Sequence, residues 1–365
     1  MNSAPVDTTF GICIGPVDAP GATDAELYRF ALQDAALAEG LGYSGVWALE
    51  HHFSDYYPTP DPLLFLATVA GRFPRLELGT MVIVAPWYHP LRLAEGAAML
   101  SLLSDAHLHL GLGRGSAASE YEAFGMELDD SRERFREIVE IVNLALAGAP
   151  FTYQGRFHSV PKAIELRPKP ARERIHLYGA ISTPPSAAIM AKLGLPPLSN
   201  AFRPLEMHRD VLADWHKANR EAGGDPDPIL PIQAHLIVAD TDEEAEAIAR
   251  EVMPPFFQAQ VKHYESDLER YRHLKSYDFA RIHGVRTHFS DPANLGPFSA
   301  LQFFGSPKTI RRQVESYAAL GFNKFIVTVN TPGIPQSLRH EWLTRFAREV
   351  APEFARSFGG RRAAA

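Results

Sequence analysis

The chain has 365 residues, of which 46% are hydrophobic, and its formal net charge is −7. This length and composition allow a large buried core within one α/β barrel. Acidic and basic residues are interleaved along the chain, so we expect no nucleic-acid partner. Cys13 is the single cysteine, which excludes an intramolecular disulfide and fits a cytoplasmic location. Since no apolar run approaches the roughly 20 residues that span a bilayer, we expect no membrane association.

Short apolar runs alternate with amphipathic segments, which is typical of parallel strands joined by helical crossovers. The strands are expected at residues 10–14, 45–49, 76–84, 107–113, 175–180, 197–199, 232–238 and 325–329. The helices are expected at residues 24–40, 61–73, 90–103, 131–146, 185–193, 204–222, 242–250, 308–320 and 341–354. This order predicts an α/β fold of the (β/α)₈ TIM-barrel class. A doubly wound sheet shares the alternation, but no G-x-G-x-x-G motif follows the first strand, as a Rossmann fold would require.

Two stretches interrupt the alternation. Residues 152–170 are polar and rich in proline, and they predict a small hairpin followed by an irregular excursion. Residues 253–304, after the seventh strand, are rich in aromatic residues and histidine, and they predict an insertion with helical pieces. We expect residues 1–358 to form one domain and residues 359–365 to form a flexible tail.

Glu50, His51 and His52 stand where the second strand ends. The carboxyl ends of the strands of a TIM barrel face the active site, so these three residues are candidates for catalysis. An imidazole suits proton transfer because its charge changes near neutral pH. Taken alone, a histidine pair at a strand end could equally serve packing or capping.

Two further segments could bind an anion. Arg114 lies between Gly113 and Gly115 after the fourth strand, and a guanidinium can hold a phosphate through two parallel hydrogen bonds. Ser182, Thr183 and Ser186 follow the fifth strand at the start of a helix. Hydroxyls and free backbone N–H groups at a helix start can bind a phosphate, although the same residues could simply cap the helix.

His107 and His109 alternate on the fourth strand and therefore share one face. Such a pair, preceded by Asp105, could bind a metal, as in a metal-dependent hydrolase. The other strand ends do not supply a convincing set of further ligands, and the pair lies early in its strand. We therefore expect no metal.

Three blocks, in this order, resemble the bacterial-luciferase-like family of flavin-dependent monooxygenases, including the luciferase alpha chain. They are LGYSGVWALEHHF at residues 41–53, LGT at 78–80 with HPLRLAE at 89–95, and LGLGRG at 110–115 with FG at 124–125. Each block is weak by itself, but their order and spacing together are specific.

The resemblance implies a role for each candidate residue. It makes His51 the catalytic histidine, with His52 and Glu50 supporting it. It places Arg114, beside Gly113, and Ser182, Thr183 and Ser186 at the phosphate of FMN. It puts a non-proline cis peptide at Met81-Val82, and Ser199 at the edge of the flavin-ring pocket. The pocket walls are expected to include Trp47, Phe53 and Trp87.

The resemblance also implies the reaction. Reduced FMN, supplied by a separate NAD(P)H:flavin reductase, would react with O₂ to give a flavin peroxide that oxygenates an aldehyde or ketone, or hydroxylates a carbon, of a small organic substrate. The segment at 253–304 would be a mobile loop that closes over the flavin, or else a packed insertion. A homodimer is expected by the same analogy.

Three alternatives stay open at this stage. The first is a deazaflavin-dependent hydride-transfer enzyme on the same barrel, the second is a flavin-binding protein without catalysis, and the third is the metal hydrolase. The EHHF sequence at residues 50–53 favours FMN over deazaflavin only weakly.

Overall fold

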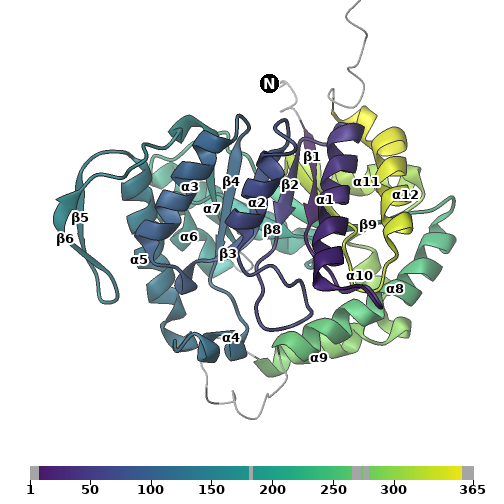
Figure 1. Cartoon of the computed structure of the whole chain (residues 1–365). Coiled ribbons are helices and arrows are strands. Elements are labelled where there is room, and N and C mark those ends of the chain that lie inside the picture. The colour runs from purple at the N-terminus through teal and green to yellow at the C-terminus, as the bar shows by residue number, and fades with distance from the viewer. Residues whose placement is uncertain (1–7, 181–183, 265–272, 274–278, 356–365) are drawn as a thin grey trace, which may run out of the picture.

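Eight parallel strands close into a ring with helices outside it, as the computed structural model of the chain shows (Figure 1). It describes residues 8–180, 184–264, 273 and 279–355, so the expected tail and the hydroxyl residues Ser182 and Thr183 lie outside the described residues. The barrel strands are, in order around the ring, β1 (Thr9–Ile14), β2 (Gly45–Ala48), β3 (Glu77–Val84), β4 (Leu108–Gly113), β7 (Ile175–Ala180), β8 (Pro197–Asn200), β9 (Pro231–Val238) and β11 (Lys324–Thr328).

Closure of the ring separates the two candidate folds. β11 pairs with β1 and β8 pairs with β9, both in parallel, so the sheet has no free edge among these eight strands. A doubly wound sheet would stay open. The (β/α)₈ prediction is therefore confirmed, and a short strand β10 (Phe303–Gly305) extends the pairing on β9.

The helices alternate with the strands, and most have bounds close to those expected. Those around the barrel are α1 (Asp24–Leu41), α2 (Pro62–Ala70), α3 (Pro90–Leu103), α5 (Ser131–Leu146), α6 (Pro184–Lys192), α7 (Leu205–Glu221), α8 (Asp242–Tyr264), α11 (Pro307–Ala318) and α12 (Gln336–Arg345). The smaller helices are α4 (Ala118–Ala123), α9 (Phe279–Phe289) and α10 (Gly296–Ser299). None of the helices in the described part of the chain is long and apolar enough to cross a membrane.

Local sequence explains several of these bounds. The Glu26 carboxylate accepts a hydrogen bond of 2.9 Å from the backbone N–H of Thr23, which caps the start of α1. Gly42 ends that helix with φ of 93°, a left-handed conformation that glycine adopts without a Cβ penalty. Asp61 caps α2 by accepting a hydrogen bond from the N–H of Leu64.

The structure extends one expected helix and moves the start of another. The helix expected to begin over residues 242–250 continues through Pro254 and Pro255, so α8 is 23 residues long and occupies the start of the expected insertion. The closing helix starts at Gln336 rather than at residue 341 and continues as a π-helical turn over Phe346–Val350. Interior prolines and weak amphipathic periodicity made both boundaries hard to recognise in the sequence.

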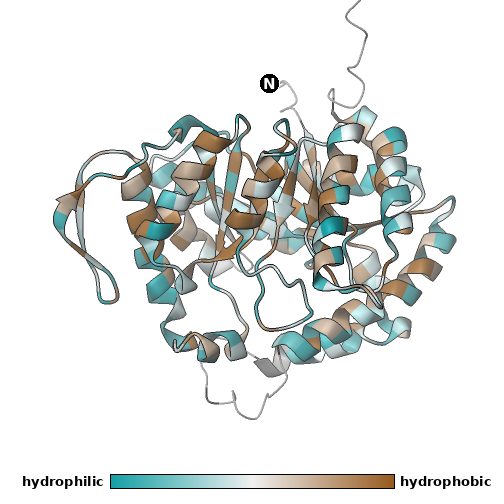
Figure 2. Ribbon diagram, viewed as in Figure 1, coloured by the Kyte–Doolittle hydropathy of each residue, from teal (hydrophilic) through white to brown (hydrophobic). Residues whose placement is uncertain are grey.

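The strands are largely apolar (Figure 2). Trp47 packs inside the barrel with Cys13, Tyr178, Leu198 and Ile326. The Trp47 ring lies over Gly79, where a Cβ atom would come within 2.2 Å of the ring. The ring also stacks on His109, with a centroid distance of 5.3 Å. Trp47 is 1% exposed, and its expected place in the wall of the flavin pocket stays a prediction. Gly79 has no side chain, so it leaves space in the core that the Trp47 ring fills.

His109, one of the two histidines on β4, belongs to a polar group of side chains at one end of the barrel. The Glu77 carboxylate lies 2.6 Å from Nζ of Lys324 and 3.4 Å from Nε2 of His109, while Tyr178 pairs with Nδ1 of His109 at 3.0 Å. Glu77 and Lys324 begin their strands, so this polar group lies at the amino end of the barrel. Within the described ranges, neither His107 nor His109 belongs to a group of three possible metal ligands. The amino end of a TIM barrel ordinarily serves stability.

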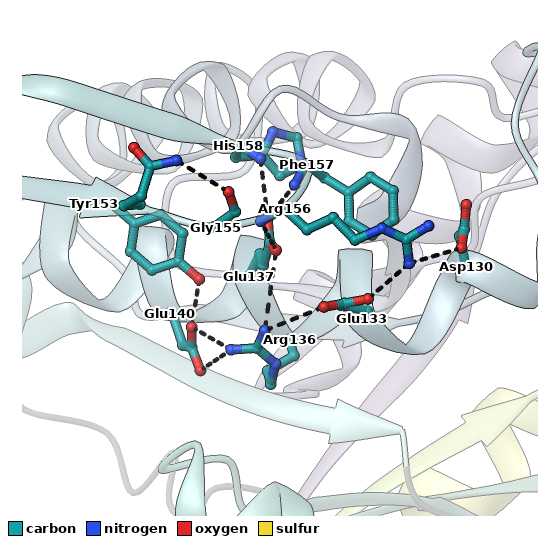
Figure 3. A network of polar contacts seen from close by, with 11 residues as sticks. Asp130, Glu133, Arg136, Glu137, Glu140, Tyr153, Gly155, Arg156, Phe157 and His158 are labelled. Atoms are coloured by element: carbon teal, nitrogen blue, oxygen red, sulfur yellow. Dashed lines mark hydrogen bonds and ion pairs between the residues drawn. The ribbon is translucent and has the colours of Figure 1, made fainter.

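The hairpin of β5 (Phe151–Gln154) and β6 (Ser159–Ile164) confirms the first interruption of the alternation. Its turn is fastened to α5 by the buried Glu137 carboxylate (Figure 3). Oε1 accepts the backbone N–H of Arg156 at 2.6 Å, and Oε2 accepts those of Phe157 and His158 at 3.0 and 2.9 Å. Burial raises the pKa of Glu137, but these hydrogen bonds outweigh it and leave the pKa below 4.5.

A Glu137→Gln substitution should destabilise the fold by about 2 kcal/mol, because the new amide would turn a donor toward at least one of the three backbone N–H groups. Urea unfolding measures the loss. Glu133→Gln is the matched control on the same helix; its carboxylate is partly exposed and pairs with Arg156, so its loss should cost less than about 1 kcal/mol. Equal losses in the two variants would contradict the role assigned to Glu137.

Candidate active site

The predicted residues from β2, β3 and β4 meet at the carboxyl end of the barrel, where Figure 1 shows α4 and α9 beyond the strands. β2, β3 and β4 are neighbours in the ring, so the segments that follow them lie side by side. A cavity of about 550 Å³ opens at this end. It is lined by Asp18, Ala22, Asp24, Leu27, His51, His52, Phe53, Ser54, Asp55, Pro58 and Pro60.

Glu50 is a buried carboxyl group that fixes His52. Its Oε2 accepts the backbone N–H of Val84 at 2.7 Å, and its Oε1 lies 3.1 Å from Nε2 of His52. Burial raises the pKa of Glu50 to about 7, and the contacts with His52 and Val84 limit the rise. The ring of His52 stands edge-on to Trp87 and Phe124, with centroid distances of 4.9 Å to each. These contacts fix His52 beside the cavity, and the supporting role of Glu50 and His52 in catalysis stays a prediction.

His51 lies in an aromatic cage. Its ring is 4.9 Å from the centroid of Tyr56 and 4.7 Å from that of His263, and its Nε2 is 3.4 Å from the hydroxyl of Tyr264. Burial holds the pKa of His51 well below the ordinary 6.5, and the neighbouring His263 and His52 lower it further. The imidazole is therefore neutral at physiological pH and can accept a proton.

Glu120, on α4, joins the loop after β2 to α8. Its Oε1 accepts the backbone N–H of His52 at 2.7 Å and lies 3.3 Å from Nε2 of His263. The other ring nitrogen of His263 is 2.7 Å from the hydroxyl of Ser54. Glu120 is 2% exposed and His263 5% exposed, so these contacts are shielded from solvent.

The cis peptide expected at Met81-Val82 is present in β3. The regular pairing of β3 with β4 shifts there, between Thr80 and Ile83. Gly113 makes room for the segment, because a Cβ at this position would come within 2.4 Å of Cγ2 of Val82. Met81 and Val82 pack against the interior group that contains Trp47.

Arg114 follows β4 at the same rim. Its guanidinium donates to the hydroxyl of Ser131 at 3.0 Å, and its backbone carbonyl accepts the hydroxyl of Tyr121. Gly115 has φ of 68°, and a Cβ there would come within 2.6 Å of Val84, so this turn requires glycine. The loop thus holds a cationic side chain in a tight glycine turn at the rim.

Of the serine and threonine residues predicted after β7 and in β8, the described residues include Ser186 and Ser199. Ser186 lies in the first turn of α6, which begins beyond β7, the neighbour of β4. In β8, Leu198 packs in the barrel interior, so the alternation of the strand turns Ser199 to the other face and gives Asn200 the inward one. Ser199 is 5% exposed, and its expected place at the flavin edge finds no support in this orientation.

Sequence reasoning missed Glu120, Ser54 and His263. His263 is 212 residues from His51 along the chain, and no local motif links them. Its neighbour Tyr264 belonged to the aromatic and histidine-rich stretch, so composition marked the region but not the residue.

The luciferase-like monooxygenase family model matches residues 8–324, and the chain belongs to this family. It is therefore a flavin-dependent monooxygenase by class. The chain is similar to the flavin-dependent trigonelline monooxygenase, oxygenase component, of Acinetobacter baylyi, with 25% identity over 350 residues that cover 93% of each chain.

Solved structures share the fold. Monooxygenase RslO1 from Streptomyces bottropensis has a TM-score of 0.79 at 25% identity, covering 95% of this chain and 100% of that one. The oxygenating constituent of 3,6-diketocamphane monooxygenase from Pseudomonas putida, in complex with FMN, has a TM-score of 0.72 at 20% identity, covering 96% and 99%. An F420-dependent secondary alcohol dehydrogenase has a TM-score of 0.71 at 16% identity, covering 97% and 99%.

The raised pKa of Glu50 predicts a pH-dependent stability. Between pH 4.5 and about 7 the folded chain holds a proton on Glu50 that the unfolded chain has released, so this carboxyl makes the free energy of unfolding fall as pH rises through that window. The loss should reach at most about 3 kcal/mol. Glu50→Gln should remove this part of the dependence, and urea unfolding between pH 5 and 8 measures it. The exposed Glu315→Gln variant is the control and should keep the wild-type profile; a Glu50→Gln profile parallel to it would refute the assignment.

Proposed function

We propose that the protein uses reduced FMN and O₂ to oxygenate a small organic substrate, at an aldehyde or ketone carbon or by hydroxylation. The observation that carries the proposal is His51: an imidazole whose pKa burial holds well below its ordinary value lines the cavity at the carboxyl end of the barrel. Bound reduced FMN would supply the electrons that activate O₂, which no amino-acid side chain can do. The chain's own residues would bind, orient and shield the reactants.

The phosphate of FMN would bind between the ends of β4 and β7. Arg114 offers a guanidinium in a glycine turn, and Ser186 offers a hydroxyl in the first turn of a nine-residue helix. Ser182 and Thr183 belong to the same proposed phosphate site. Gly113 would contribute by giving room to Val82, whose side chain occupies the space of a Cβ there. These groups fit the cofactor.

His51 would handle the proton that the reaction moves. With its pKa held low by burial, the imidazole accepts a proton from a flavin or substrate atom and returns it as product forms. Glu50 would keep His52 in place beside it. The aromatic rings of Tyr56, Trp87 and Phe124 surround this histidine pair and limit the access of water.

A separate flavin reductase would be the partner. The trigonelline relative is named an oxygenase component, which supports a division of labour between two proteins. On this proposal the present chain receives reduced FMN and does not bind NAD(P)H itself. The helices α8 and α9 would close over the flavin.

A deazaflavin-dependent hydride transfer is the second candidate, because the F420-dependent dehydrogenase has the same fold. Titration with FMN, reduced FMN and deazaflavin separates the two, followed by stopped-flow mixing of the reduced complex with O₂. Preferential binding of reduced FMN and rapid O₂ consumption are expected. Tight deazaflavin binding without O₂ consumption would replace the proposal with the second candidate.

A His51→Ala variant should bind FMN as the wild type does and lose roughly 10²-fold or more of its turnover with the reductase, because the phosphate anchor is intact and the proton carrier is gone. Equilibrium titration and steady-state O₂ uptake measure the two quantities. His216→Ala, on α7, is the control and should change neither. Wild-type turnover in His51→Ala would remove His51 from the mechanism.

We propose a homodimer formed through α2 and α3. Four large apolar side chains on these helices are half exposed or more, and a second copy would cover them: Leu64, Met99, Leu102 and Leu103. Leu103→Lys, which places a charge on this face, should shift the sedimentation coefficient from dimer to monomer. Wild-type protein that sediments as a monomer at micromolar concentration would contradict the proposal.

A further inference from the structure

Two histidines and a carboxylate converge at one wall of the cavity. One ligand atom each from His51, Glu120 and His263 lies within 4.8 Å of the others. Nε2 of His263 and Oε1 of Glu120 are 3.3 Å apart, close to the separation of two ligands on one ion. The three come from the loop after β2, from α4 and from α8, so the tertiary fold alone assembles them.

The group contains a buried atom that lacks a hydrogen bond. Nε2 of His263 has no hydrogen-bond partner among the described residues, although the side chain is 5% exposed. Buried polar atoms ordinarily have a partner, so an unpartnered nitrogen aimed at a carboxylate indicates a missing cation or proton between them.

Surrounding groups orient these side chains as they do at metal sites. The Ser54 hydroxyl lies 2.7 Å from Nδ1 of His263 and fixes the orientation of its ring. The backbone N–H of His52 donates to Oε1 of Glu120 and fixes the carboxylate. Ligands held in advance in this way lose little conformational freedom when an ion binds.

The ligand set also selects the ion. Two imidazoles and one carboxylate suit Zn²⁺ and similar transition-metal ions, whereas Mg²⁺ and Ca²⁺ prefer sets made of oxygen atoms. His51 and Ser54 line the cavity, so an ion can enter from there, and substrate or water could fill its remaining positions.

We propose that His51, Glu120 and His263 bind one Zn²⁺-class ion, and that this ion inhibits the enzyme by occupying a ring nitrogen of His51. The binding site stands on geometry alone. The inhibition rests on the proposed function, because it requires His51 to handle a proton during turnover.

Calorimetric titration of the tag-free, flavin-free protein with ZnCl₂ tests the site. We expect one Zn²⁺ per chain and no comparable binding of MgCl₂. His263→Gln should abolish this binding, and Ser54→Ala should weaken it by about 10- to 100-fold. His216→Gln is the matched control and should bind as the wild type does. Thermal unfolding of each variant shows whether it is folded.

The outcomes separate the site from its consequence. If the wild type binds no Zn²⁺, or if folded His263→Gln binds it unchanged, the site is overturned and the proposed function is untouched. Adding Zn²⁺ to the enzyme, reduced FMN and O₂ should slow flavin reoxidation in the wild type and have no effect in His263→Gln. Binding without any effect on reoxidation would overturn the inhibition and would count against the role of His51.

Discussion

Closure of the parallel ring is the constraint on which the site depends. The pairings of β11 with β1 and of β8 with β9 leave no free edge and bring the carboxyl ends of all eight strands to one rim. The loop after β2, the cis peptide of β3 and the turn after β4 become neighbours only because of this geometry. The packing of Trp47 over Gly79 fills the ring from within and holds the neighbouring strands in register.

Two buried acidic residues, Glu50 and Glu120, hold the histidines of the site in position. Glu50 binds the side chain of His52 and the backbone of β3, whereas Glu120 binds the backbone of His52 and faces His263. The loop between them is therefore fixed on two sides, and His51 lines the cavity. A buried carboxylate is costly unless its oxygens are satisfied, so each of these contacts stabilises the site as well as the fold.

The amino end of the barrel also brings a buried histidine and a carboxylate together. Glu77, Lys324 and His109 form a closed polar group with Tyr178. Among the described residues, neither His107 nor His109 belongs to a group of three possible metal ligands. The two ends thus contain similar residue types, and what separates them is the charge balance: the Lys324 ammonium lies 2.6 Å from the Glu77 carboxylate, whereas two histidines face Glu120.

The sequence by itself determined the order and class of the elements, because period-two and helical patterns, caps and glycine turns act over a few residues. It also placed Glu50, His51, His52 and Arg114 at strand ends, since strand ends are local features. Only the tertiary structure decided that Trp47 turns into the core, that Ser199 faces away from the barrel interior, and that Glu120 and His263 join His51. These results depend on which segments closure of the ring brings together, and contacts across 212 residues leave no trace in local periodicity.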